Sequence, residues 1–309
     1  MKVMVLGASG YAAGPLVRAL RGAGHEVCGL ARSAKSAAAL AAQNVEVIEG
    51  DAREPSGWMR SISDVDAMIT LLTVADFGAE GEMMRALVEG FREEDRTFIF
   101  TCGTAVLSIE AHEGRWNEAT FAEDDPFPFP ELAIRRLRLP TENMVREAGT
   151  GGYRTMVVRP PLIYGNGGSN QVPGFFDSAL EHGFVSYVGM GLNLYSNVHV
   201  EDLAVLYPLA LDRGQGGALY HAVGGEANFR EIAEAAGQVL NMPVRSLSLQ
   251  DACKVRHPAR VRLGIAVNSR SRSPRARSEL GWEPKRVDMI DDIRNGSYRE
   301  AYGHLRRLG

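Results

Sequence analysis

Short apolar segments alternate with stretches of helical spacing over the first half of the chain. The opening run, Lys2–Leu6, shows no polar–apolar alternation, which is typical of a parallel strand buried on both faces. Similar runs lie at Glu26–Leu30, Val45–Ile48, Ala67–Leu72, Thr97–Phe100 and Thr155–Val158. Helical spacing is found at Tyr11–Ala23, Ala34–Ala42, Glu80–Gly90 and Thr141–Ala148. This alternation predicts an α/β protein with a doubly wound, Rossmann-type parallel sheet.

The regular alternation ends near Tyr164 and gives way to a glycine-rich loop and mixed short elements. We therefore expect residues 1–165 to form a dinucleotide-binding domain, to which 193–223 also contribute. Residues 166–309 then form a smaller, interleaved substrate-binding region. The arginine- and serine-rich run Ser269–Ser278 is expected to be a solvated loop that leads into a helix, with Ser273 at its N-cap and Pro274 at its first position.

Composition indicates a small-molecule partner. The chain has 34 Lys and Arg against 38 Asp and Glu, a net charge of −4, so no global field would gather nucleic acid or an anionic membrane. Its three cysteines have no CxxC spacing, which argues against a disulfide framework and against a metal site. The opening apolar run is too short for a signal peptide or a membrane span. A cytoplasmic location is the expectation.

A glycine loop directly follows the first strand and opens the first helix, as a dinucleotide fingerprint requires. It reads Gly7-Ala8-Ser9-Gly10-Tyr11-Ala12-Ala13-Gly14. Gly7 would permit the tight turn, and Gly10 would let backbone amides approach a pyrophosphate. Ser9 and Tyr11 belong to the same loop, so we expect the four residues to contact the cofactor.

The end of the second strand points to the kind of cofactor. NAD-binding folds carry an acidic residue there for the ribose 2′-hydroxyl, whereas this chain reads Leu30-Ala31-Arg32-Ser33-Ala34-Lys35. Arg32 and Ser33, aided by Lys35, would hold a 2′-phosphate through charge-assisted hydrogen bonds. The sequence therefore favours NADP(H) over NAD(H).

Six motifs occur along the chain in a characteristic order: GASGYAAG, VEVIEGDARE, FIFTCGTAVL, VVRPPLIYGNG, NVHVEDLA and ELGWEP. In this the chain resembles the extended short-chain dehydrogenase/reductases of the NAD-dependent epimerase/dehydratase type. The resemblance implies that Asp51 contacts the adenine and that Leu71 and Leu72 lie by the ribose or phosphates. It also implies that Arg159, Pro160 and Pro161 border the nicotinamide.

The same resemblance bears on substrate and assembly. Family members line the substrate pocket with stretches that here hold Asn166–Phe176, Tyr187, Asn193 and Tyr195. Many of them also form homodimers through the helices expected here at Glu80–Gly90 and Thr141–Ala148.

The family's catalytic pair is missing from its usual place. Counting back from Glu142 puts Arg138 at the position of the family's Lys and Ile134 at that of its Tyr, and isoleucine cannot move a proton. Arg138 would still anchor ribose hydroxyls as a fixed cation. Pro140 is expected to begin the following helix, which would leave Arg138 in a loop. After the fifth strand, Thr104 is the best remaining donor to a substrate oxygen.

Three interpretations follow. The first is a divergent NADP(H)-dependent oxidoreductase, with Thr104 polarising a carbonyl and Arg138 positioning the cofactor. The second is a non-redox dehydratase, isomerase or cyclase that uses Asp124 or Asp125 from the irregular segment Asp124–Pro130. The third is a catalytically silent protein that senses the cofactor. Because the glycine loop and Arg32 are retained, the oxidoreductase is the leading hypothesis.

Overall fold

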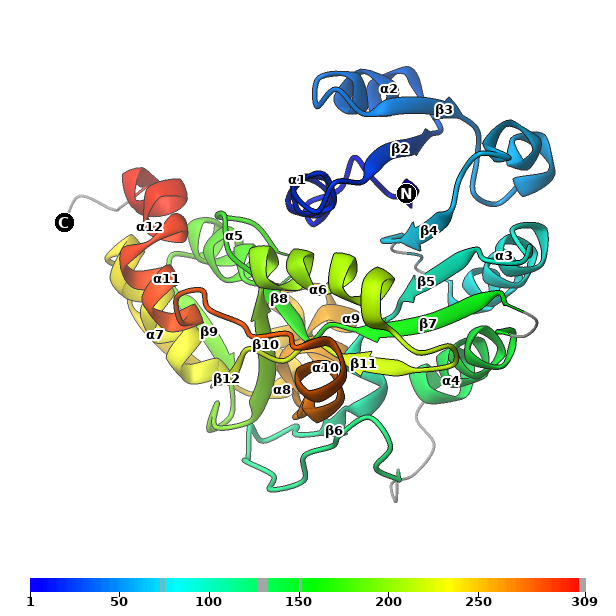
Figure 1. Ribbon diagram of the computed structural model, residues 1–309. Coiled ribbons are helices and arrows are strands. Elements are labelled where there is room, and N and C mark those ends of the chain that lie inside the picture. The colour runs from blue at the N-terminus through cyan, green and yellow to red at the C-terminus, as the bar shows by residue number, and fades with distance from the viewer. Residues whose placement is uncertain (73, 75, 127–132, 150–151, 170, 306–309) are drawn as a thin grey trace.

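A parallel sheet of seven strands organises the molecule (Figure 1). The computed structural model describes residues 1–72, 74, 76–126, 133–149, 152–169 and 171–305. The strand order is β11-β7-β5-β4-β1-β2-β3, and every neighbouring pair is parallel. The strands are β1 (Lys2–Leu6), β2 (Glu26–Ala31), β3 (Glu46–Glu49), β4 (Ala67–Thr70), β5 (Thr97–Thr101), β7 (Arg154–Arg159) and β11 (Leu219–His221). The predicted doubly wound sheet is confirmed, and its direction of winding switches between β1 and β4.

Helices cover both faces of this sheet and bury one apolar stripe each. One face carries α1 (Ala13–Gly22), α2 (Ala34–Ala41), α6 (Val200–Arg213) and α10 (Pro274–Leu280). The other carries α3 (Phe77–Gly90) and α4 (Ala133–Glu147), whose apolar side chains pack on β1, β4 and β5. None of the helices in the described ranges is both long and apolar enough to cross a bilayer.

A smaller mixed region builds a separate apolar core at one end of the large sheet (Figure 1). Its strands are β6 (Ile109–Glu110), β8 (Leu162–Tyr164), β9 (Val185–Val188), β10 (Leu194–His199), β12 (Gly225–Asn228), β13 (Val244–Leu247) and β14 (Val267–Asn268). They pair as β12-β10-β8, β13-β9 and β14-β6. Its helices are α5 (Pro173–His182), α7 (Phe229–Leu240), α8 (Leu249–Val255), α9 (Pro258–Arg260), α11 (Met289–Asn295) and α12 (Ser297–Tyr302). Helical turns lie at Pro55–Gly57, Met59–Ile62, Thr104–Leu107, Val261–Ile265 and Gly303–Leu305.

Helix α4 corrects one expectation from the sequence. It begins at Ala133 and runs through Pro140, so Arg138 lies within a helix and not in a loop. Proline removes one intrahelical hydrogen bond, but tertiary contacts hold the turns that precede it. Arg135 donates from Nε to the Val106 carbonyl at 2.6 Å, and Arg138 is bonded to Glu80 on α3. Of the irregular segment Asp124–Pro130, residues 127–130 lie outside the described residues.

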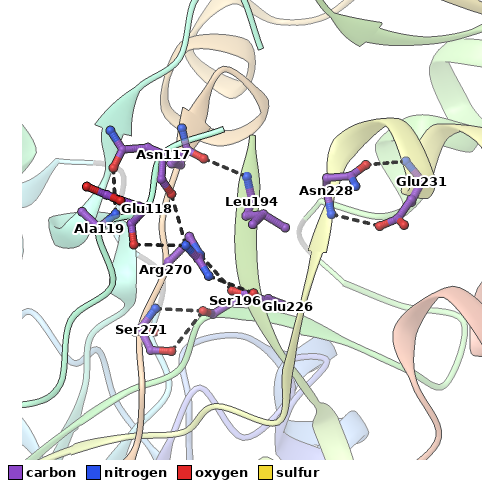
Figure 2. A network of polar contacts seen from close by, with 11 residues as sticks. Asn117, Glu118, Ala119, Leu194, Ser196, Glu226, Asn228, Glu231, Arg270 and Ser271 are labelled. Atoms are coloured by element: carbon purple, nitrogen blue, oxygen red, sulfur yellow. Dashed lines mark hydrogen bonds and ion pairs between the residues drawn. The ribbon is translucent and has the colours of Figure 1, made fainter. Parts of the chain in front are cut away.

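The run Ser269–Ser278 is less solvated than predicted. Ser269, Ser271 and Ser273 are buried, because alternate residues of this extended segment point inward. Arg270 donates to both carboxylate oxygens of Glu226 at 3.0 Å and to the carbonyls of Asn117 and Glu118 (Figure 2). Helix α10 does begin at Pro274 after Ser273, but no hydrogen bond from the Ser273 side chain caps it. The run therefore ties the loop that contains Asn117 to β12.

Candidate functional site

The glycine loop lies at the switch point of the sheet. Gly7 has φ +85°, and a Cβ on it would come within 3.1 Å of the Leu71 carbonyl carbon and oxygen at the end of β4. The Gly10 amide closes the turn by donating to the Gly7 carbonyl at 2.9 Å. Both conditions favour glycine at these positions.

Helix α1 leaves an anion seat directly after this turn. The N-cap residue of α1, Ala12, makes no side-chain capping hydrogen bond, so the positive end of the helix dipole is left without a side-chain cap. The Ala13 amide donates to the Gly10 carbonyl at 3.1 Å, and Pro15 has no amide hydrogen. Ser9 and Gly10 beside it are exposed. An open helix N-terminus behind a glycine turn fits the pyrophosphate of a dinucleotide, with Leu71 and Leu72, both half-buried, along its edge.

Tyr11 connects this loop to the smaller region. Its hydroxyl donates to the Gly165 carbonyl at 2.7 Å, and a Cβ on Gly168 would approach its ring to 2.5 Å. Burial raises the pKa of Tyr11 far above its ordinary value, so the phenol stays protonated and bound to the backbone. The contact predicted with the cofactor would therefore use the exposed part of the ring rather than the hydroxyl.

Two exposed cations, Arg32 and Lys35, follow β2. Arg32 is exposed, and its guanidinium has no hydrogen-bond or ion-pair partner within the ranges that the structure describes. Ser33, by contrast, uses its hydroxyl to cap α2 by accepting from the Ser36 amide at 3.2 Å. Arg32 is thus available to a phosphate, and so is Lys35 in the first turn of α2, which is also exposed and has no side-chain partner within the described residues.

Asp51 lies near Arg32 but is already paired. Arg53 Nε donates to both carboxylate oxygens of Asp51, at 3.0 Å to Oδ1 and 3.2 Å to Oδ2. The hydrogen bonds from Arg53 lower the pKa of Asp51 to about 2, and Arg32 adds a smaller effect in the same direction. The carboxylate is therefore ionised, and a contact between Asp51 and an adenine, which the resemblance implies, would compete with Arg53.

The carboxyl end of β5 meets the loop after β7. The Thr104 amide donates to the Pro160 carbonyl at 3.1 Å, while the Thr104 side chain is 1% exposed and its Oγ1 has no hydrogen-bond partner within the described part of the chain apart from the phenol of Tyr195. A Cβ on Gly103 would meet only the Pro160 oxygen and Arg138 Nη1, each at 3.8 Å. A side chain as small as a methyl group would thus fit at Gly103 without a clash, beside the buried Thr104 hydroxyl. Pro161 follows in the same loop and is also buried.

Gly103, Thr104 and Pro160 form a corner, here called the Thr104 corner, and Arg138 lies beside it. Arg138 is held there by an acidic partner that the sequence did not reveal. Its Nε and Nη2 each bond a carboxylate oxygen of Glu80 at 2.9 Å, and its guanidinium lies over the Phe77 ring at 4.9 Å. Glu80 is 1% exposed, and burial raises its pKa although Arg138 opposes this. The third nitrogen, Nη1, is the one directed toward Gly103.

At the position that the resemblance assigns to the family's tyrosine, the side chain is Ile134, which cannot donate a proton. Ile134 is buried on the same helix as Arg138, one turn earlier. Burial raises the pKa of the Cys102 thiol well above its ordinary value, with Glu142 adding to the effect, so this cysteine is protonated and a poor nucleophile.

A second buried ion pair lies behind the corner. Arg159 at the end of β7 bonds Glu142 on α4 from Nε at 2.8 Å, and its Nη1 is 3.5 Å from His221 Nε2. Burial lowers the pKa of His221 to about 3, and Arg159 adds to this, so the ring is neutral. Arg159 therefore supports the loop of Pro160 from behind. Glu142 and His221 carried no local sequence signal for this pairing.

The two carboxylates of the non-redox interpretation are engaged elsewhere. Asp124 pairs with Arg275, and Asp125 pairs with Arg272 at 3.1 Å and accepts from the Ala122 amide at 2.7 Å. Each lies on the surface at the arginine-rich run. Neither is brought to the Thr104 corner.

Comparisons with known proteins agree with this geometry. Residues 3–223 match the model of the NAD dependent epimerase/dehydratase family. The uncharacterised protein YLL056C of Saccharomyces cerevisiae is 30% identical over 305 residues, which cover 95% of this chain and 98% of that protein. A 4-hydroxy-2-methyl-3-oxo-4-farnesyl-3,4-dihydroquinoline-1-oxide ketoreductase of Stigmatella aurantiaca is 26% identical over 236 residues, 73% of this chain and 69% of that enzyme.

Among solved structures, the dTDP-glucose 4,6-dehydratase of Bacillus anthracis in complex with NAD superimposes with a TM-score of 0.77. The match covers 99% of each chain at 14% sequence identity. At this identity the likeness shows a shared fold and carries no statement about substrate.

Proposed function

The chain belongs to the NAD dependent epimerase/dehydratase family, and from that premise we propose that it is an NADP(H)-dependent reductase of ketones. The family binds a nicotinamide dinucleotide, and the open N-terminus of α1 behind Gly7 and Gly10 fits its pyrophosphate. When bound in reduced form, this cofactor supplies a hydride to a carbonyl carbon.

NADP(H) is the proposed form of the cofactor because of Arg32. An exposed guanidinium without a protein partner, in the place where NAD-binding folds have a carboxylate, suits a 2′-phosphate. Arg53 is less suited to this role, since Asp51 already holds it.

The observation that carries the proposal is the buried Thr104 hydroxyl, which has no partner within the described residues apart from the phenol of Tyr195. A buried hydroxyl with unused hydrogen-bonding capacity costs free energy, and a substrate oxygen at this corner would reduce that cost. The bond would strengthen as negative charge develops on a carbonyl oxygen, which is the change that reduction requires. The ketoreductase of Stigmatella aurantiaca among the relatives supports the same class of reaction.

The other two interpretations receive less support. A non-redox reaction through Asp124 or Asp125 would need these carboxylates released from Arg275 and Arg272. A silent sensor would have no use for a buried hydroxyl with spare hydrogen-bonding capacity at Thr104.

The test is incubation of the purified chain with NADPH or NADH and a small ketone panel, for example ethyl acetoacetate and 1-phenyl-1,2-propanedione. Loss of the reduced nicotinamide absorbance with formation of the alcohol supports the proposal. Calorimetric binding of NADPH without oxidation on any ketone would favour the sensor. Conversion of a substrate without net oxidation of the reduced nicotinamide would favour the non-redox enzyme.

A further inference from the structure

Four hydroxyl groups from distant parts of the chain converge beside the carboxyl end of β5. Thr104 and Ser108 belong to the turn after β5, Tyr195 to β10, and Ser269 to the arginine-rich run. Ser269 Oγ donates to the Thr104 carbonyl at 2.9 Å, and a parallel bridge pairs Ser269 with Tyr195. These two contacts place β10 directly against the Thr104 turn.

The cluster is buried but incompletely bonded. Tyr195 is 4% exposed, and its ring is fixed edge-on to Phe229 at a centroid distance of 6.1 Å. Apart from the phenol of Tyr195, whose pKa they lower, the hydroxyls of Thr104 and Ser108 have no hydrogen-bond partner within the described residues. Buried donors are nearly always fully satisfied in folded proteins, so two hydroxyls with no partner other than one fixed phenol leave hydrogen-bonding capacity for a ligand oxygen.

We propose that Tyr195 donates the proton to the substrate oxygen, in place of the tyrosine that α4 lacks at Ile134, while Thr104 holds the same oxygen. This inference rests on the proposed ketone reduction. The carbonyl carbon gains a hydride, the C=O π pair moves onto oxygen, and oxygen takes the Tyr195 Oη proton to complete the alcohol. The resulting phenolate takes a proton from water.

The electrostatic surroundings of Tyr195 suit a donor. Burial raises the pKa of its phenol, while the hydroxyls of Ser269, Thr104 and Ser108 and the guanidinium of Arg138 lower it by smaller amounts. The phenol therefore keeps its proton at neutral pH. The same neighbours would stabilise the phenolate that forms when the proton leaves.

The test compares Tyr195→Phe with wild type and with a matched control, Tyr153→Phe. Tyr153 is also a buried tyrosine, but it lies before β7 at the amino edge of the sheet and bonds the Val88 carbonyl. With a ketone that wild type reduces, we expect Tyr195→Phe to lower kcat by about 10²–10⁴ and the control to leave it within about threefold. Calorimetric affinity for NADPH should be the same in all three proteins.

A second measurement does not depend on turnover. Wild type saturated with NADPH and titrated with the corresponding alcohol, such as ethyl 3-hydroxybutyrate, forms a complex that cannot react. Because one neutral hydrogen bond is removed, Tyr195→Phe should bind the alcohol about 2- to 12-fold more weakly than wild type, and the control should bind it as wild type does. Melting curves of both variants check that they are folded.

Each outcome is decisive. Wild-type kcat and alcohol affinity in a folded Tyr195→Phe would overturn the role of Tyr195 and leave the reductase standing. Failure of wild type to reduce any ketone of the panel would overturn the reductase, and the role of Tyr195 with it. A fall in kcat together with weaker alcohol binding supports the proposal.

Discussion

Removal of the Arg32 guanidinium should separate the two forms of the cofactor. Arg32 is exposed and has no protein partner among the described residues, so Arg32→Ala breaks no internal contact and should leave the melting temperature unchanged. A hydrogen bond to a charged group contributes about 1.5–3 kcal/mol. The affinity for NADPH should therefore fall by about 10- to 150-fold, and the affinity for NADH should hardly change.

The assay is calorimetric titration of both cofactors at fixed ionic strength, because an exposed charge pair is screened by salt. Arg60→Ala serves as the matched control. Arg60 is also exposed, but it lies in the helical turn Met59–Ile62 and not at the end of β2. It removes one positive charge without touching the proposed phosphate site. Raised salt should narrow the NADPH preference of wild type and leave that of Arg32→Ala nearly constant.

Three results would refute this reasoning. Equal affinity of wild type for NADPH and NADH would remove the basis for a 2′-phosphate site. A parallel loss for both cofactors in Arg32→Ala would show that the side chain acts on a shared part of the dinucleotide. If Arg60→Ala lowered the NADPH affinity as much as Arg32→Ala, the loss would reflect the net charge of the protein and not a specific phosphate site.

The site residues at the Thr104 corner give three further predictions. Thr104→Val should lower kcat by about 10²–10³ without weakening the binding of NADPH, and unchanged kcat would contradict its role. Arg138→Ala should destabilise the fold by about 3–5 kcal/mol in denaturant unfolding, because Glu80 is left buried and unpaired. It should also weaken NADPH binding if Arg138 anchors the cofactor ribose. Adding Glu80→Gln should recover part of the stability but none of the NADPH affinity. For His221, the pKa falls from 6.5 to about 3 on folding, so the neutral ring stabilises the fold above pH 6.5. The free energy of unfolding therefore decreases by about 1.4 kcal/mol per pH unit as the pH falls from 6.5 toward 3. His221→Asn should show a shallower acid slope than wild type, and equal slopes would exclude the effect.

The sequence was most informative where local pattern determines structure. Strand β1 has the bounds that its apolar run predicts, and Gly7 needs its positive φ because the chain turns directly against Leu71. Such features depend on neighbours in the chain or on a single close approach at the switch point. The cofactor side of the site could therefore be proposed from residue order alone.

Helix α4 shows the limit of that approach. Pro140 favours a helix start by local rules, and these rules are outweighed by contacts of Arg135 and Arg138 with residues far away in the sequence. The partner of Arg138 is 58 positions earlier, and the hydroxyl of Tyr195 meets Thr104 across the boundary between the two regions. Spacing carries no information on such pairs, so the sequence pointed to Arg138 but not to Glu80.

If Arg138 stands where the resemblance implies the family's lysine, its geometry explains why arginine suits the position. Two nitrogens of the planar fork are fixed on Glu80, and the third still reaches toward Gly103. A lysine has a single nitrogen, which could not bond both oxygens of the Glu80 carboxylate while also reaching toward Gly103. The exchange fixes α3 against α4, but it replaces a tunable amine with a cation that cannot give up its proton. A reductase built this way needs its proton from another element, and β10 is the element that brings a phenol to the same corner.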